Sequence, residues 1–439
     1  MLSWLLAKLH VECTIFTTRI LSTNVDLTLS TSFTSNCFVL LIVFMYIMTT
    51  IYSIGYLTFE RDKHKVRFHI FTFLSVITCI GLAYSANLFT AFIFYDLLSV
   101  FTYMLVRHHA DENSETHAFQ YAMYLILPSM LFLLPAIISV YQITEYTDFI
   151  AGGILSEYPI SNIYINFLFL LFIYGISKTA LYPLHRWLIH AMVAPSPVSA
   201  LLHAVLVVKG GLFFLYKVIN ETFGLELLRE NIYTFFGLHW PIYIAGLSII
   251  LAALSAINSE NIKQRLAYST ISQIGYISLC LFCFTEESIN GAKMQFLAHS
   301  FAKISLFYYA GYLLARYHCT NVSELKYTRN RLNIVLSILW LIPCASLMSM
   351  PMTIGFISKH IIITGAINKL QDLMLLLIFF AGMLLCISYL SPIINHLTSF
   401  NNKNKKFSRQ YGSTFCVYFS AFIIAVCVIA GYFLCLKLL

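Results

Sequence analysis

Long apolar segments recur along the whole chain, separated by short polar stretches. Each has near 20 residues or more, enough for a helix to cross the hydrocarbon core of a bilayer. Backbone polar groups cannot face lipid unpaired, so segments of this kind must be helical. The pattern predicts an all-α polytopic membrane protein with about 12 transmembrane helices, at 37–58, 68–88, 89–107, 118–141, 164–188, 196–219, 238–257, 264–283, 294–315, 332–366, 371–391 and 413–434. Residues 1–36 are mixed and rich in Thr and Ser, and we expect an interfacial or irregular lead-in there.

The composition supports a membrane protein and excludes a soluble domain. Of the 439 residues, 59% are hydrophobic and 10% are charged, whereas soluble domains have about 25% charged residues. The 11 cysteines are mostly scattered inside apolar segments. Cys280 and Cys283 form a lone CxxC without a second pair, which favours small helix-facing residues over a metal or redox site.

The basic residues are distributed unevenly between the two sides of the predicted bundle. Loops that follow alternate spans, starting with the first, hold most of the Lys and Arg. Cytoplasmic or matrix loops show this bias in membrane proteins. We therefore expect these loops inside and both termini on the outer side, and the bias accounts for the net charge of +8 without nucleic acid.

Five ionisable residues fall inside predicted spans instead of loops. They are one acid and four lysines, namely Asp96, Lys178, Lys209, Lys303 and Lys359. Such groups are costly inside a bilayer and usually mark ion or proton pathways. The simpler alternative for Lys178 is a side chain that extends to the interface near Trp187.

Two of these lysines lie beside predicted helix breaks. Pro183 cannot donate to the carbonyl of Thr179, so it would open the helix next to Lys178. Pro351 and Gly355 precede Lys359 in a second break. Paired broken helices indicate a transporter with internal repeats.

The breaks divide the chain into two predicted five-helix repeats, each with one broken helix. They span 68–220 and 232–391. A first transmembrane helix and basic loop precede them at 37–67, and a basic loop and C-terminal helix follow at 392–439.

Two histidines complete the candidate site. His299 and Lys303 are four residues apart and share a helix face, whereas His203 and Lys209 are six apart and face different neighbours. Burial favours the neutral form of lysine and histidine titrates near neutrality, so both suit a proton relay. Asp96, the one acid inside a span, is the expected partner of Lys178. No Walker loop, GxGxxG or cysteine cluster occurs, so we expect no cofactor, no metal and no catalytic residue in this chain.

These blocks resemble the antiporter-like subunit family shared by respiratory complex I and Mrp-type cation/proton antiporters. The most specific block is KTALYPLHRWLIHAMVAPSPVSALLHAVLVVKGG at 178–211, and the others are YSIGYL (52–57), NIKQRLAYSTISQIGYISL (261–279), AHSFAKISLF (298–307) and GFISKHIII (355–363). The resemblance implies that Lys178 and Lys359 are the broken-helix lysines, that His203 belongs to the next helix, and that His299 and Lys303 form the central relay. Asp96 stands where the family usually has glutamate, which has one more methylene.

The resemblance implies a proton-translocating subunit of a multisubunit complex. Its expected partners are other membrane subunits of a respiratory or antiporter complex, the lipid bilayer, and protons or sodium, in a bacterial plasma membrane or the mitochondrial inner membrane. The match begins on what would be the family's third helix. Two alternatives stay open, a structural paralogue without transport and a solute symporter, and the wording of the blocks does not decide between the complex I and Mrp types.

Overall fold

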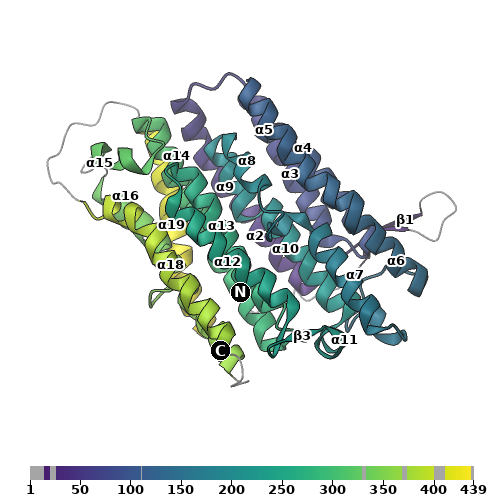
Figure 1. Cartoon of the computed structure of the whole chain (residues 1–439). Coiled ribbons are helices and arrows are strands. Elements are labelled where there is room, and N and C mark those ends of the chain that lie inside the picture. The colour runs from purple at the N-terminus through teal and green to yellow at the C-terminus, as the bar shows by residue number, and fades with distance from the viewer. Residues whose placement is uncertain are drawn as a thin grey trace. The chain divides into compact units, whose positions relative to one another are not determined.

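A computed structural model describes residues 14–19, 26–109, 111–328, 333–367, 373–399 and 411–436. Backbone contacts divide the chain into two compact units. The first unit comprises Met1–Tyr46, Phe68–Ala191 and Val205–Phe235, and the second comprises Ile47–Arg67, Met192–Ala204 and Phe236–Leu439. Figure 1 shows that long helices make up almost all of the described chain.

The first unit is built on helices of the N-terminal half. Two strands, β1 (Thr14–Arg19) and β2 (Asp26–Ser30), pair antiparallel within the stretch expected to be an irregular lead-in. Helix α2 (Phe33–Phe59) begins in this unit and continues into the second. The other helices are α3 (Lys65–Tyr84), α4 (Leu88–Val106), α5 (Glu112–Pro128), α6 (Leu134–Thr144), α7 (Asn162–Gly175), α8 (Trp187–His190), α10 (Val207–Lys217) and α11 (Leu225–Asn231), with π-helical segments at Ser129–Leu133 and Val218–Phe223 and strand β3 at Thr234–Phe235.

The second unit contains the longest helix of the chain's described part, α14 (Glu286–Tyr317). It packs against α13 (Ile262–Leu281), α9 (Ser196–Ala204) and α17 (Ile354–Ile367). The remaining elements are β4 (Leu238–His239), α12 (Trp240–Asn258), α15 (Leu325–Thr328), α16 (Ile334–Leu347), α18 (Leu373–Leu397) and α19 (Tyr411–Leu436).

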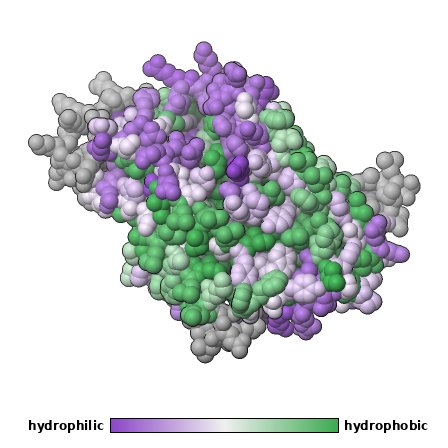
Figure 2. All heavy atoms as spheres, viewed as in Figure 1, coloured by the Kyte–Doolittle hydropathy of each residue, from purple (hydrophilic) through white to green (hydrophobic). Residues whose placement is uncertain are grey.

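Eight helical segments of the described residues are long and apolar enough to cross a membrane, and three shorter apolar helices accompany them. The polytopic all-α class is therefore confirmed, whereas the count of about 12 is not. Figure 2 shows apolar side chains over a broad area of the visible face, with hydrophilic ones gathered at its margins. On α18, Leu377 and Leu384 are 61% and 67% exposed, as expected for side chains that face hydrocarbon.

The first predicted helix break differs from the observed one. The span expected at 164–188 ends at Gly175, where α7 comes so close to the π segment that a Cβ on Gly175 would lie 2.5 Å from the Leu133 nitrogen. A 3₁₀ turn at Ser177–Thr179 follows, and Ala180 then adopts the left-handed conformation. Pro183 lies beyond the helix in a non-helical connection, so it does not open a helix by freeing the Thr179 carbonyl.

The second break separates α16 from α17, in place of one interrupted span at 332–366. Pro351 lies inside the break between Ser349 and Met352, which both have left-handed backbone angles. Gly355 lies in the first turn of α17. Its N–H donates to Ser346 Oγ at 3.3 Å, and a Cβ there would collide with the Ser346 carbonyl oxygen. Gly355 thus allows α17 to approach α16 closely.

The span expected at 196–219 is divided as well. Helix α9 ends at Ala204, α10 begins at Val207, and Leu206 between them has non-helical angles. The Cys79 thiol donates to the carbonyl of Leu206 at 3.6 Å. This interruption coincides with the boundary between the two units.

Candidate functional site

Lys178 is fully buried in the 3₁₀ turn that follows α7. Its Nζ donates to the Tyr95 carbonyl and to Ser99 Oγ, both at 2.7 Å, and lies 3.2 Å from the centroid of the Tyr95 ring. The backbone N–H of Lys178 donates to the Tyr95 hydroxyl at 3.0 Å. One turn of α4 therefore surrounds this ammonium with a carbonyl, a hydroxyl and an aromatic face.

Two contacts hold the Lys178 turn in place. The Trp187 indole donates to the Ser177 carbonyl at 3.0 Å, and the Ala180 N–H donates to the same oxygen at 2.9 Å. On the other side, Gly211 of α10 comes so close that an added Cβ would lie 2.7 Å from the Lys178 Cβ. The break is closely packed in the part of the first unit that the structure describes.

Asp96 does not form an ion pair with Lys178, contrary to the pairing expected from the sequence. Its Oδ1 accepts a hydrogen bond from Ser129 Oγ at 2.7 Å, in the π segment. Its buried Oδ2 has no hydrogen-bond partner among the described residues. Successive helix residues point about 100° apart, so when Tyr95 faces Lys178 the Asp96 side chain is turned elsewhere. The carboxylate still interacts with Lys178 through charge at longer range.

A hydrogen-bonded chain connects His203 with Lys303 inside the second unit. His203 Nδ1 lies 3.1 Å from Thr270 Oγ1, and Thr270 Oγ1 donates to the Leu266 carbonyl at 2.9 Å. The same carbonyl accepts from Lys303 Nζ at 3.0 Å, and Ser269 Oγ also contacts this ammonium. The structure therefore brings His203 and Lys303 to one turn of α13.

The other predicted site residues are buried as well. His299 lies on α14 one turn before Lys303 and is fully buried. Lys359, on α17, is 2% exposed; its Nζ donates to the Leu347 carbonyl at 3.1 Å and lies 5.1 Å from the Tyr276 ring centroid. Lys209 is fully buried on α10 and belongs to the first unit, whereas His203 belongs to the second.

The sequence reasoning missed the neutral groups that solvate these lysines. Ser99, Ser269 and Thr270 are fully buried and each contacts a predicted relay residue or its partner. Their only signal in the sequence was a hydroxyl inside an apolar span, which is common in membrane helices because it can bond to its own helix backbone.

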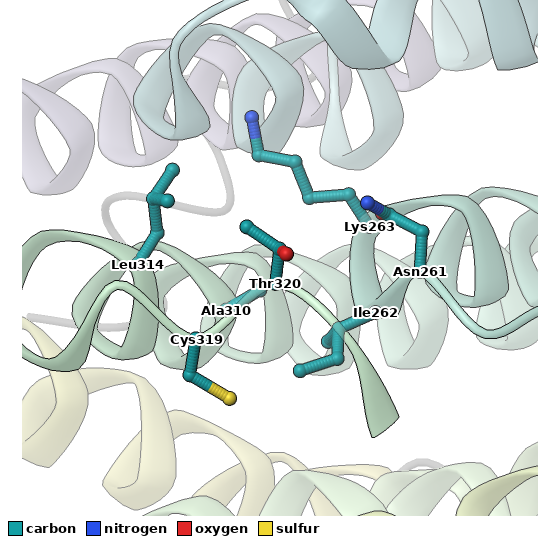
Figure 3. Close-up of a pocket in the computed structure, with 7 residues that line it drawn as sticks. All are labelled: Asn261, Ile262, Lys263, Ala310, Leu314, Cys319 and Thr320. Carbon is teal, nitrogen blue, oxygen red and sulfur yellow. The ribbon is translucent and has the colours of Figure 1, made fainter. Parts of the chain in front are cut away.

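Figure 3 shows a small cavity where α13 begins and α14 ends. It measures about 30 Å³ and is lined by Asn261, Ile262, Lys263, Ala310, Leu314, Cys319 and Thr320. Lys263 Nζ donates to the Ala194 carbonyl at 2.7 Å and so anchors the segment before α9. A cavity of this size holds about one water and is far below the roughly 300 Å³ of the smallest usual solute sites.

The family model for "NADH:quinone oxidoreductase/Mrp antiporter, TM" matches residues 85–387. The chain belongs to this family. The match covers both helix breaks and every site residue predicted from the sequence. The predicted family is thereby confirmed.

Curated relatives of the family are similar over part of their length. The chain is 30% identical over 319 residues to NADH-quinone oxidoreductase subunit M of Rickettsia prowazekii (strain Madrid E), covering 72% of this chain and 63% of that protein. It is 31% identical over 281 residues to the chloroplastic NAD(P)H-quinone oxidoreductase subunit 5 of Phaseolus vulgaris, covering 63% and 36%. The chain thus spans less than two thirds of either relative.

Solved structures show the same fold at lower identity. The Mrp complex from Dietzia sp. DQ12-45-1b contains a chain with a TM-score of 0.79 and 19% identity, over 97% of this chain and 45% of that one. A chain of the membrane-bound sulfane sulfur reductase, an archaeal respiratory membrane complex, has a TM-score of 0.78 and 21% identity. The match covers 97% of this chain and 85% of that one. At this identity, the similarity supports the polytopic fold of the family.

Proposed function

We propose that the chain is a proton-translocating membrane subunit of a multisubunit complex of this family. Protons would pass through the partly buried Asp96 and the buried groups Lys178, His203, Lys209, His299, Lys303 and Lys359. The observation that supports this proposal is that neutral groups surround the lysines. Lys178 and Lys303 each bond to a carbonyl and a hydroxyl, and Lys359 bonds to a carbonyl. Among the described residues, none of the three has a carboxylate within ion-pair distance.

Neutral partners suit a group that must gain and lose a proton. A lysine paired with a buried carboxylate would leave an uncompensated charge each time it became neutral. A lysine solvated by carbonyls and hydroxyls loses its proton without that cost, and its nitrogen can then accept one again. A charge at longer range, such as that of Asp96 acting on Lys178, would shift the equilibrium between the protonated and neutral lysine without locking it in either form.

The turn of α13 at Leu266–Thr270 would join Lys303 to His203. A carbonyl cannot carry a proton onward, so the Leu266 oxygen serves to hold the two donors close together. The hydroxyls of Ser269 and Thr270 can rotate, accepting from one neighbour and donating to another. We propose that a proton moves between Lys303 and His203 through these hydroxyls or through water beside them.

The chain would work with other membrane subunits, as expected for a member of this family. Transport would be coupled to NADH:quinone electron transfer or to cation exchange, with protons or sodium as the ion. We place it in a bacterial plasma membrane or the mitochondrial inner membrane, with the basic loops inside and both termini outside. The two five-helix repeats at 68–220 and 232–391 belong to this proposal.

A second candidate is a structural paralogue that no longer transports. This candidate would hold if transport needed a direct pair of Asp96 and Lys178, because the Asp96 carboxylate accepts from Ser129 instead. A solute symporter has less support, because the cavity at Lys263 has room for only about one water.

The proposal can be tested in proteoliposomes containing the complex purified through a tag on this chain. Proton flux is followed with an enclosed pH dye under an imposed membrane potential. We expect Lys178→Ala and Lys303→Ala to lower flux by about tenfold or more, since each removes a proton-transfer group. Lys326→Ala, at an exposed lysine of α15, is the matched control. Flux equal to wild type in both buried-lysine variants would favour the structural paralogue, and the co-purified subunits would identify the parent complex.

A further inference from the structure

A set of buried polar residues in the second unit takes no part in the relay described above. Gln273 of α13, Gln295 of α14, Ser358 of α17 and Tyr389 of α18 meet in its interior, each at most 2% exposed. Burying two primary amides is costly unless their groups are hydrogen-bonded. Their convergence from four helices therefore calls for a role.

These four residues form one directional hydrogen-bonded chain. Ser358 Oγ donates to Gln295 Oε1 at 2.6 Å, and Gln295 Nε2 donates to Gln273 Oε1 at 2.8 Å. Gln273 Nε2 then donates to the Tyr389 hydroxyl at 3.2 Å. Each amide accepts through oxygen and donates through nitrogen, so the chain runs without interruption from α17 to α18. We call these four residues the amide clamp.

The amide clamp lies directly beside Lys359. Ser358 precedes this lysine on α17, and the Leu347 carbonyl that accepts from Lys359 Nζ also accepts from the Cys386 thiol at 3.6 Å. Gln273 Nε2 donates to the same sulfur at 3.7 Å. The clamp is therefore linked through the Cys386 thiol to the Leu347 carbonyl at the end of α16, the group to which Lys359 bonds.

The clamp also lies close to the central part of the site along the sequence. Gln295 is four residues before His299 on α14, and Gln273 is four residues after Ser269 on α13, so each pair shares a helix face. Cys386 lies within electrostatic range of both Lys303 and Lys359. The two amides thus lie near the residues that surround Lys303 as well as those that surround Lys359.

We propose that Gln273 and Gln295 are positioning residues that hold the broken helix α17, and with it Lys359, while offering that lysine no side chain that takes up a proton. A neutral amide neither gains nor loses a proton in the range in which lysine and histidine do. The two amides of the clamp fix the place of Lys359 and leave its proton exchange to water and to the ionisable groups. Neutrality, as well as shape, is then the property that matters at position 295.

The decisive variant is Gln295→Glu, which keeps the shape and adds a carboxylate. The new oxygen atoms can accept from Ser358 and, once the Gln273 amide turns over, from Gln273, so the fold is retained. The negative charge beside Lys359 would favour the ammonium form. In the proteoliposome assay we expect the pH dependence of flux to shift toward alkaline pH and maximal flux to fall severalfold.

Two further variants separate the charge from the clamp. Gln295→Met has a similar volume without hydrogen bonds, and we expect lower flux with an unshifted pH dependence. Gln264→Glu makes the same chemical change at an exposed position of α13 and should alter neither. A wild-type pH dependence in Gln295→Glu, or wild-type flux in Gln295→Met, would overturn the proposal.

This inference rests on the proposed function, since flux is its main readout, and a stability measurement keeps the two apart. In thermal unfolding, Ser358→Ala and Gln295→Met should each destabilise the protein, and the double variant should cost less than their sum because they remove the same hydrogen bond. Lys359→Ala with wild-type flux would contradict the proposed function alone. Strict additivity of the two clamp variants would contradict the clamp alone.

Discussion

Tyr95 holds Lys178 at three points, with its backbone carbonyl, its ring and its hydroxyl. The carbonyl and the ring contact the ammonium, whereas the hydroxyl accepts the backbone N–H of Lys178. One residue thus fixes both the side chain and the backbone of the lysine.

These contacts can be separated by two substitutions. Tyr95→Phe keeps the ring and leaves the buried N–H of Lys178 unpaired, which should cost about 1–3 kcal/mol of stability with a modest loss of flux. Tyr95→Leu also removes the ring and should lower flux further. Thermal unfolding and proteoliposome flux measure the two effects. Tyr103→Phe, at a partly exposed position of α4, is the control, and equal flux in the Phe and Leu variants would show that the ring contributes nothing.

Adjacent glycines on α10 provide a steric test of the Lys178 turn. A Cβ on Gly211 would lie 2.8 Å from the Lys178 carbonyl carbon and 2.9 Å from the Thr179 nitrogen, whereas one on Gly210 would meet the flexible end of Leu82 at 3.2 Å. Gly211→Ala should therefore lower the free energy of unfolding by about 1–3 kcal/mol and lower proton flux by displacing Lys178. Gly210→Ala should leave the stability and the flux nearly unchanged. Similar unfolding temperatures for the two variants would contradict the close packing at Gly211.

Thr270→Val tests the connection between His203 and Lys303. The variant keeps the branched shape and removes the hydroxyl that lies 3.1 Å from His203 Nδ1. We expect flux to fall severalfold while stability falls by only about 1 kcal/mol, the net value of a typical hydrogen bond. Thr270→Ser restores the hydroxyl and should restore flux. Equal flux in the Val and Ser variants would exclude a role for this hydroxyl.

The loop after α14 predicts a pH-dependent stability. Backbone N–H groups of Asn321 and Thr320 hold the pKa of the Glu324 carboxyl below its usual value. A depressed pKa in the folded state means that the ionised carboxylate stabilises the loop above the unfolded pKa of about 4.3 and that this contribution is lost as pH falls through the folded value. Wild type should unfold at a higher temperature than Glu324→Gln at neutral pH, and the difference should vanish in acid. The exposed Glu287→Gln is the control, and a difference that persists in acid would refute the assignment.

The sequence predicted the fold class, the family and the burial of the ionisable residues. Lys178, Lys209, Lys303 and Lys359 could be found because a charged residue inside an apolar span is rare enough to notice. Hydroxyl and amide side chains inside apolar spans are too common to indicate a site. In the sequence they resemble polar residues that bond to their own helices, and this applies to Ser99, Thr270, Gln273 and Gln295.

The helix breaks were harder to predict because they depend on tertiary contacts. Gly175 sits in a continuous apolar run, and only its approach to Leu133 explains why α7 ends there. Pro183 was the visible local signal and proved to lie past the helix end. The predicted ion pair of Asp96 and Lys178 was wrong for a similar reason. The sequence does not show whether Tyr95 or its neighbour Asp96 faces the lysine.

The π segment at Ser129–Leu133 has a consequence for how this part of the chain tolerates insertion and deletion. A π turn accommodates one residue more than the α-helical register allows, and such turns are frequent at functional sites. Because each helix residue advances the direction by about 100°, deleting one residue here would restore the α register and rotate α6 relative to α5. The Ser129 hydroxyl would then leave the Asp96 carboxylate, and Leu133 would leave Gly175. The count of residues in this helix, as much as their identity, sets the geometry of the first break.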